Sequence, residues 1–462
     1  MNSEVAEPAG ALAKAFWAVI ALAAVTGACA ILAARDLVYD GAYYLLAIAA
    51  RGEFQLWEPA RASVLILEQC FAVAGAWLGI QDLWTLGRLF SLAVTGWPVF
   101  LTALCWFVLP KGEKSWIAGP LVNLVFAIPT TSFIGIGEGT IASCLLWLAF
   151  LLVAFRIDHA WGAIASVVAT AVCAFSHESA AVCLGAIAIL ALWRSGGLTG
   201  FPRLAALASA TIAGAAAVNM LRWIIFPRSV VERGDFLAGS MGGFLGSLHA
   251  PNIPALASLV AAAAIIVPFA RGKLPSAATS AAALAALLLL LLVLIATPDQ
   301  TLAPSRFFAA RGVPVALTTI LAVVFLVMMN RGSRPARLVS RPVLAVILGL
   351  AATQAAAQTI MTQRWNSYVH DLRTFVTTPR GAISHAETMQ ALDPARSRFR
   401  RELLESWSVE PLSIVLAPHG RVMTVVEPAP DAPWVPYRPG DPTTLPRAPQ
   451  LHWSGFSPHL AR

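Results

Sequence analysis

Charged side chains are scarce in this sequence, and their scarcity excludes most classes of soluble protein. Lys, Arg, Asp and Glu make up 12% of the 462 residues, whereas they make up about a quarter of a soluble domain. Apolar residues make up 58%, and the mean hydropathy is +0.72. This composition is typical of a polytopic membrane protein.

Cysteines are few and carry no recognisable spacing. All six lie in or beside apolar segments, and the polar tail after residue 361 contains none. The sequence therefore predicts neither a disulfide framework nor a zinc site. No other group of His, Cys and Asp has a metal-ligand spacing, so a divalent metal stays open as a cofactor and its ligands are unknown.

Positive charge is not gathered in one patch. The net charge is +8, but the surplus is spread over alternate loops between apolar segments, which argues against a nucleic-acid partner. The positive-inside rule assigns these loops to the cytoplasm. The amino terminus is then cytoplasmic and the carboxyl terminus periplasmic or extracellular. Heavy use of Ala and Leu points to the cytoplasmic membrane of a bacterium.

Apolar segments long enough to span a bilayer, or slightly shorter, recur along the chain. We place eleven of them, at approximately 14–33, 84–109, 116–135, 140–155, 161–176, 179–193, 204–226, 254–270, 277–297, 312–329 and 342–360. Residues 63–80 form a further apolar segment that contains Glu68 and Gln69. Counting it as a span would invert every later loop, so the charge rule favours a helix lying at the membrane surface.

Two regions differ in composition. Residues 1–360 hold the apolar segments and a long first outer loop, 34–83, and predict an all-α membrane bundle. Residues 361–462 are polar and predict a small α+β domain on the outer face, with a helix over about 383–407. Within it, 412–416 and 421–426 flank Pro418-His419-Gly420, a pattern typical of a β-hairpin.

Acidic residues concentrate in the loops assigned to the outer face. The stretch Arg35-Asp36-Leu37-Val38-Tyr39-Asp40-Gly41-Ala42-Tyr43-Tyr44 directly follows the first apolar segment. Carboxylates at the mouth of a membrane bundle have to be hydrated, paired or used in function. Asp36 and Asp40 are therefore candidate catalytic residues, and Tyr43 and Tyr44 are candidate substrate-binding residues.

Glu138 and His177-Glu178 lie in outer loops that are too short for ordinary surface acids. Glu138 precedes a helix, so it either points into the mouth of the bundle or caps that helix. His177 and Glu178 are likewise either substrate-binding or capping residues. If the bundle brings together the loops after the first, third and fifth segments, then Glu138, His177 and Glu178 would lie close to Asp36 or Asp40. Such a cluster could carry out acid-base catalysis.

Arginines on the same side are candidates for binding a phosphate, because a guanidinium group matches phosphate oxygens in a bidentate manner. They are Arg233 in one long loop and Arg306 and Arg311 in the next. Arg306, within Pro304-Ser305-Arg306-Phe307-Phe308, is placed to hold a lipid-linked phosphate at the headgroup level. Its alternative role is an interfacial anchor beside the two phenylalanines.

This layout resembles the GT-C superfamily of integral-membrane glycosyltransferases. The resemblance rests on Asp36 and Asp40-Gly41-Ala42-Tyr43-Tyr44 in a long first outer loop, on Glu138 in the second, on an odd number of helices and on an outer carboxyl-terminal domain. It implies a polyprenyl-phosphate-linked sugar as donor and a lipid, glycan or protein as acceptor. It also implies that an acid of the first outer loop is the catalytic base and that Glu138 assists the acceptor or a metal. We choose Asp40 as that base, with Asp36 as the alternative; the other of the two is then a positioning or helix-capping residue.

Other classes of function stay open at this point. A transporter or flippase of lipid-linked intermediates would also have an outward-facing polar cavity, but it would carry ionisable residues through the membrane depth or show repeat symmetry. A membrane acyltransferase with His177 as base leaves Asp36 and Asp40 without a role. A non-catalytic membrane scaffold is a further alternative. The oligomeric state is not predicted.

Overall fold

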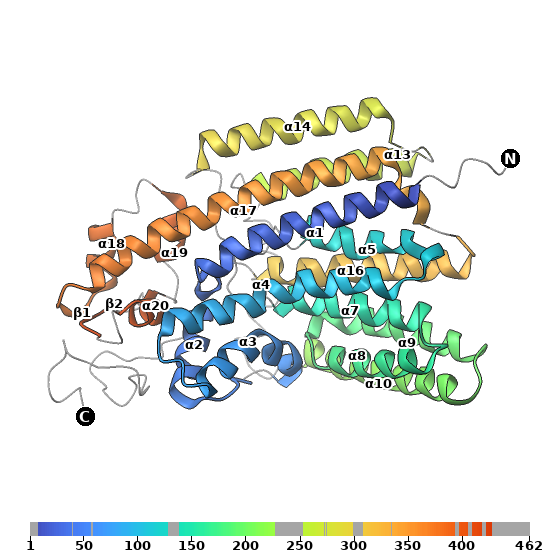
Figure 1. Cartoon of the computed structure of the whole chain (residues 1–462), viewed down its shortest axis with the longest axis horizontal. Helices are drawn as coiled ribbons and strands as arrows, with labels where there is room; N and C mark the ends of the chain where they lie inside the picture. Colours follow the sequence, from blue (N-terminus) through green and yellow to red (C-terminus); the bar gives the residue numbers. More distant parts are fainter. Residues whose placement is uncertain are drawn as a thin grey trace.

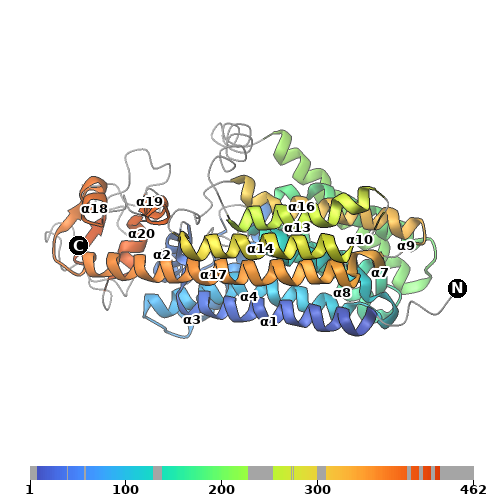
Figure 2. The same cartoon turned by 90° about the horizontal axis from the view of Figure 1, so that it is seen from above.

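The part of the chain that the structure describes is almost entirely helical, as the computed structural model in Figure 1 shows. The structure describes residues 8–38, 40–56, 59–127, 138–226, 253–271, 273, 275–298, 308–333, 335–392, 397–404, 409–417 and 422–426. Long helices run side by side along the longest axis of the molecule. Figure 2 shows the same layout from above.

The bundle is built from apolar helices. They are α1 (Pro8–Leu32), α4 (Leu83–Val108), α7 (Glu138–Phe155), α8 (Ala160–Cys173), α9 (Ala181–Ser195), α10 (Gly200–Ile225), α13 (Ile253–Ala270), α14 (Ala277–Ala296), α16 (Phe308–Asn330) and α17 (Arg341–Val376). Several starts have side-chain caps. Asp82 accepts a hydrogen bond from the Thr85 backbone N–H at 2.9 Å, and Ser276 accepts one from the Thr279 N–H at 3.1 Å.

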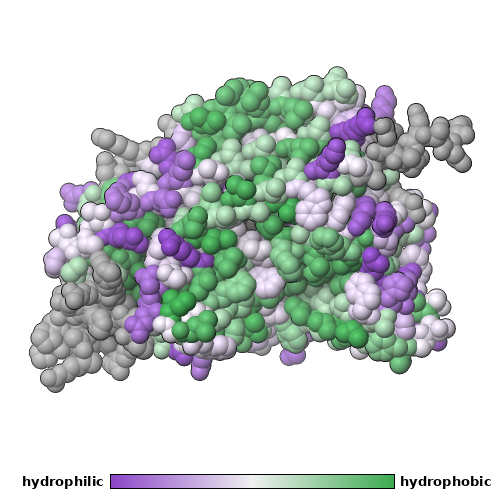
Figure 3. Space-filling model, in the orientation of Figure 1, coloured by the Kyte–Doolittle hydropathy of each residue, from purple (hydrophilic) through white to green (hydrophobic). Residues whose placement is uncertain are grey.

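Among the described residues, seven helices are long and apolar enough to cross a membrane, and three more apolar helices are shorter. Large apolar side chains cover their outer surfaces, including Leu289 at 62% exposure and Ile320 at 60%. In Figure 3 the middle of the molecule is mainly hydrophobic, and the hydrophilic residues gather toward its two ends. Such a surface is favourable in lipid and costly in water, so these helices indicate a membrane protein.

Ten of the eleven predicted spans coincide with these ten helices. The remaining one, 116–135, is not a single helix in its described part. The chain there forms the 3₁₀ helix η3 (Lys111–Ile117), the short α5 (Ala118–Val122) and the π-helix η4 (Asn123–Ala127). Residues 128–135 lie outside the described residues, and the number of membrane crossings stays a prediction.

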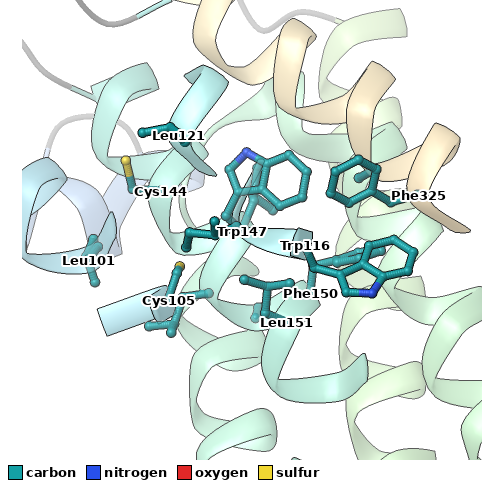
Figure 4. Close-up of a cluster of buried hydrophobic side chains, with 14 of the residues drawn as sticks. Leu101, Cys105, Trp116, Leu121, Cys144, Trp147, Phe150, Leu151 and Phe325 are labelled. Carbon is teal, nitrogen blue, oxygen red and sulfur yellow. The ribbon is translucent and has the colours of Figure 1, made fainter. Parts of the chain in front are cut away.

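A cluster of buried hydrophobic side chains, several of them aromatic, packs between α4, α5, α7 and α16 (Figure 4). The ring of Phe325 from α16 meets Trp116 edge-on at 5.0 Å and lies 5.4 Å from Trp147 of α7. A Cβ on Gly119 would lie only 2.3 Å from the Trp147 ring, so α5 approaches α7 too closely for any larger residue. These contacts hold the broken segment against α7 and α16.

The two ends of the bundle differ in charge. We call the end with Leu32, Leu83, Glu138 and Cys173 the acidic end, and the end with Lys114, Arg156 and Arg194 the basic end. Helices α2 (Asp40–Arg51) and α3 (Ala62–Trp77) lie toward the acidic end, at the left of Figure 1. Helix α3 is neither one of the seven long candidate spans nor one of the three shorter apolar helices.

Helix α17 continues well past its predicted end at residue 360 and carries the C-terminal segment, which we define as residues 381–426. This segment contains β1 (Gly381–Ile383), α18 (His385–Leu392), α19 (Arg398–Leu404), α20 (Val409–Val415) and β2 (Thr424–Val426). Figures 1 and 2 both place it at the acidic end. It shares one hydrophobic core with α2, α3 and the second half of α17.

The predicted hairpin in this segment is wrong. Residues 412–416 belong to α20 and the turn after it, and β2 instead pairs in parallel with β1, with Gly381 opposite Thr424. Residues 411–415 are all buried. A short run that is buried on every side lacks the alternation of a half-exposed strand, so its pattern does not distinguish a strand from a helix.

Candidate functional site

Arg61 joins two acids that come from distant parts of the chain. Its Nη1 lies 2.7 Å from Oε2 of Glu138, and its Nε donates to both oxygens of Glu178 at 3.0 and 2.9 Å. The Glu138 side chain is 2% exposed, and those of Arg61 and Glu178 are each 19% exposed. We call these residues the Arg61 triad. Two carboxylates share one guanidinium, so the ionised triad carries a net negative charge.

The start of α3 is fastened to the end of α8, which places Arg61 beside both acids. Arg61 ends the 3₁₀ helix η2 (Pro59–Arg61) just before α3 begins. Two residues later, Ser63 donates through its hydroxyl to the carbonyls of Val172 at 2.6 Å and Phe175 at 2.7 Å. The Ser63 backbone N–H donates to Phe175 as well, at 3.1 Å. These bonds fix the segment between α1 and α4 to the turn that carries Glu178.

His177 caps the next helical turn, η5 (Glu178–Ala180). Its Nδ1 accepts from the Ser179 backbone N–H at 3.2 Å and lies 2.7 Å from the Ser179 hydroxyl. The same nitrogen lies 3.5 Å from Oε2 of Glu178. The capping alternative for His177 is therefore present in the structure, next to the triad.

Asp40 is the first residue of α2 and is half-buried. On the same helix Tyr44 is buried and Tyr43 is half-buried. Burial raises the pKa of the Tyr44 phenol. The carboxylates of Glu138, Glu68 and Asp40 raise this pKa further, and the guanidinium of Arg61 lowers it. One phenol therefore lies within electrostatic range of the predicted base, Asp40, and of the Arg61 triad.

Asp36 occupies a different environment from Asp40. It is 3% exposed and lies in the 3₁₀ helix η1 (Arg35–Leu37) between α4 and α17. Its Oδ2 accepts from Thr95 Oγ1 at 3.0 Å, and its backbone N–H donates to Ser91 Oγ at 3.1 Å. Burial raises the pKa of Asp36, and Arg35 and the hydrogen bonds oppose that rise. Asp36 is thus packed into the bundle, whereas Asp40 retains exposure.

The predicted phosphate-binding arginines are not described at the level of their side chains. Arg233 and Arg306 lie outside the described residues, and Arg311 is described only as part of α16. Their role in binding phosphate stays a prediction. Among the described residues, no group of three or more His, Cys, Asp or Glu side chains is arranged to hold a metal ion.

Three residues at the acidic end were missed by sequence reasoning. Arg61 was not singled out as a counter-ion, and Glu68 served only to argue against a span. Glu68 is 1% exposed, and a buried acid in an apolar helix was the available signal. Glu410 of α20 is fully buried, and its charge helps to raise the pKa of Tyr43 after burial itself and Asp40. Nothing in the sequence linked it to α2.

Comparisons with known proteins do not indicate a function, so a proposal has to rest on the chemistry of this site. No protein-family model matches the chain, and neither a curated protein nor a solved structure matches it significantly. The arrangement offers a half-exposed carboxylate beside two tyrosines, and a separate pair of carboxylates held by arginine. It can therefore accept a proton at Asp40 while the Arg61 triad keeps the surrounding turns in place.

Proposed function

We propose that the protein is a membrane glycosyltransferase of the GT-C type, which transfers a sugar from a polyprenyl-phosphate donor to an acceptor hydroxyl. The observation that carries the proposal is the half-buried Asp40 at the start of α2, on the same helix as Tyr44, a phenol that lies within electrostatic range of both Asp40 and the Arg61 triad. The acceptor is a lipid, glycan or protein on the outer face of a bacterial cytoplasmic membrane.

Asp40 is the better choice of base among the acids at this end. Asp36 is only 3% exposed and accepts a hydrogen bond from Thr95, so it is less accessible to an acceptor hydroxyl than the half-buried Asp40. Glu178 and Glu138 already accept hydrogen bonds from Arg61. A carboxylate bound to a guanidinium has fewer lone pairs available for the proton of an acceptor, so these two acids suit a positioning role.

The proposed reaction is a single in-line displacement. As the acceptor oxygen bonds to the anomeric carbon, its proton passes to the Asp40 carboxylate and the bond from that carbon to the phosphate oxygen breaks. The lipid phosphate leaves as an anion, and because it is a weak base it needs no strong acid to protonate it. Arg233, Arg306 and Arg311 are proposed to stabilise its charge.

The charge difference between the ends supports an orientation. Lysines and arginines line the basic end, which by the positive-inside rule faces the cytoplasm. The acidic end and the C-terminal segment then face the periplasm or the exterior, where polyprenyl-linked sugars and outer acceptors meet.

The test is to compare the glycans and glycolipids of the source organism by mass spectrometry in four strains: wild type, deletion, Asp40→Asn and Asp82→Asn. A carboxamide keeps the shape of Asp40 but cannot take up the proton. Asp82 is the matched control, because it is an exposed acid of the same loop that caps α4, and asparagine is also a good cap. We expect the deletion and Asp40→Asn to lose the same sugar and Asp82→Asn to keep it.

Two other outcomes contradict parts of the proposal. If Asp40→Asn keeps the product that the deletion loses, Asp40 is not the base. If the deletion changes no sugar but leaves a complete lipid-linked intermediate on the cytoplasmic leaflet, the protein is a transporter and not a transferase.

A further inference from the structure

The turn between α1 and α2 is held from two sides by neighbouring residues of η1. Arg35 Nη1 donates to Oε1 of Gln358 at 2.8 Å and to Oγ1 of Thr362 at 3.1 Å, both on α17. Asp36 binds Ser91 and Thr95 on α4 instead. Consecutive side chains thus attach the turn to two different helices of the bundle.

The backbone of this turn is in a conformation that needs support. Ala34 has φ 46° and ψ 42°, in the left-handed region, which costs a residue other than glycine about 1 kcal/mol. Just before it, the Ala33 carbonyl accepts from Trp365 Nε1 of α17 at 2.9 Å. On the α4 side, Leu37 packs so closely on Gly87 that an added Cβ would lie 2.7 Å from its Cδ1. The packing therefore selects one path for the chain.

Successive backbone bonds connect this turn to the start of α2. Three backbone N–H groups each donate to the carbonyl oxygen three residues earlier, all at 3.2 Å. The donor and acceptor pairs are Leu37 and Ala34, Val38 and Arg35, and Gly41 and Val38. Asp40 lies within the last of these bonded turns. Its position therefore depends on where η1 is held between α4 and α17.

We propose that Arg35 is a positioning residue for Asp40, and that it acts by fastening η1 to Gln358 and Thr362 of α17. The inference rests on the proposed function, in which Asp40 takes the acceptor proton. A base has to lie within hydrogen-bonding distance of that hydroxyl, and a displacement of about 1 Å can slow a reaction about a hundredfold. Arg35 itself touches no substrate in this scheme.

Substitution of Arg35 alone is ambiguous, because it also leaves Asp36 buried without the nearby positive charge. The informative variant is Arg35→Gln/Asp36→Asn, which removes both charges and keeps an acceptor for Thr95. Gln is too short to span to α17 as arginine does. We expect this variant to reach the amount and detergent thermostability of Asp36→Asn, yet to form the product about a hundredfold more slowly.

The rate is measured in the deletion strain, as product per unit of membrane-embedded protein, with the cell's own donor pool. Arg88→Gln is the matched control, because Arg88 is an exposed arginine of the same region that donates to the Leu32 carbonyl at the end of α1 and, among the described residues, donates no hydrogen bond to α17. Arg35→Lys, which keeps the charge and one donor, should recover part of the rate. A folded Arg35→Gln/Asp36→Asn protein with the rate of Asp36→Asn would overturn the inference.

If the double variant does not accumulate in the membrane, a pair of milder single substitutions in α17 still tests the inference. Thr362→Val removes one acceptor of Arg35, whereas Thr359→Val removes a hydroxyl that binds only the Ala355 carbonyl of its own helix. We expect Thr362→Val to be severalfold slower than Thr359→Val, and equal rates contradict the inference. Failure of the proposed function is distinguishable, since the wild-type gene would then restore no product to the deletion strain.

Discussion

The Arg61 triad at the acidic end joins charged side chains to one another, whereas Arg156 and Lys114 at the basic end bind backbone carbonyls and aromatic rings. At the acidic end, Arg61 binds Glu138 and Glu178. At the basic end, Arg156 donates to the carbonyls of Val108 and Phe107 at the end of α4 and lies 5.7 Å from the Trp161 ring. Lys114 likewise donates to the Trp106 carbonyl and lies 4.7 Å from its ring.

The two arrangements differ in what remains after one cation is removed. Loss of a basic-end cation exposes helix-terminal carbonyls that can bind water or tilt, at a cost of about 1 kcal/mol. Loss of Arg61 leaves two carboxylates close together, one of them almost fully buried. Arg156 and Lys114 therefore resemble ordinary helix-end caps, whereas the two carboxylates of the Arg61 triad depend on a single cation.

The largest effect is expected from Arg61→Gln. Two uncompensated acids should lower the free energy of unfolding by about 3 kcal/mol, less than a fully buried pair would because Arg61 is partly exposed. Equilibrium unfolding in detergent micelles measures the change. The matched variant at the other end, Arg156→Gln, should cost only about 1 kcal/mol.

A rescue experiment sharpens the same comparison. Arg61→Gln/Glu138→Gln/Glu178→Gln removes all three charges and should return to within about 1 kcal/mol of the wild type. If Arg61→Gln and Arg156→Gln lose equal stability, or if the triple variant is no better than Arg61→Gln, the contrast between the two ends is wrong.

An intermediate effect is expected from Gly162→Ala at the basic end. A Cβ there would lie 1.9 Å from the Arg156 carbonyl oxygen and 2.7 Å from its Cβ, so either α8 or Arg156 has to move. We expect a loss of about 2 kcal/mol in unfolding free energy, with product formation unchanged in membranes. Gly185→Ala is the control, since nothing lies within 4 Å of its added Cβ. A tolerated Gly162→Ala would contradict the close packing of α8 on Arg156.

The smallest effect is expected from Asp36→Asn, which separates the two aspartates. Asparagine keeps an acceptor for Thr95 and the backbone bond to Ser91, so product formation should fall less than about threefold, against a complete loss for Asp40→Asn. A complete loss in Asp36→Asn instead would make Asp36 the base.

The pH dependence of stability gives a second measure of Asp36. Burial raises its pKa in the folded state above the ordinary value of 3.8. Between pH 3.8 and the raised pKa of the folded state, the Asp36 carboxyl is protonated in the folded protein and ionised in the unfolded chain. The folded protein then binds more protons, so this group makes the free energy of unfolding fall as pH rises. Asp36→Asn should remove that part of the slope, and an unchanged slope would contradict the burial of the carboxyl.

The spans were predictable because each is a long apolar run, and length with hydropathy identifies such helices without knowledge of their neighbours. The structure of segment 116–135 was harder to predict. Its composition is apolar throughout, but the chain there changes from 3₁₀ to α to π geometry. Close approach of Gly119 to Trp147 and the bond from Asn123 to Ser143 at 2.9 Å are tertiary contacts, and no local pattern encodes them.

The sequence predicted the acidic residues of the candidate site, but it did not predict the side chains that bind them. Short loops identified Glu138 and Glu178, but their counter-ion, Arg61, is 77 and 117 residues away in the chain. Arg35 and Gln358 are separated by 323 residues. The sequence favoured Asp40 as the base and left Asp36 open, but it did not predict their different burial, which follows from how η1 is packed. The catalytic role of Asp40 stays a prediction.

The length of α17 bears on the depth in a membrane at which Asp40 is held. Its 36 residues make a rod about 54 Å long, which exceeds the roughly 30 Å of a hydrocarbon core. Gln358, where Arg35 attaches, lies 17 residues after Arg341, about 26 Å along that rod. If Arg341 lies at the cytoplasmic boundary, as the proposed orientation requires, we expect Asp40 to lie near the boundary where acyl chains give way to headgroups. On the proposed function, the thickness of the surrounding lipid would then decide whether that carboxylate meets water, and thinner or thicker bilayers should change the rate without any change in the protein.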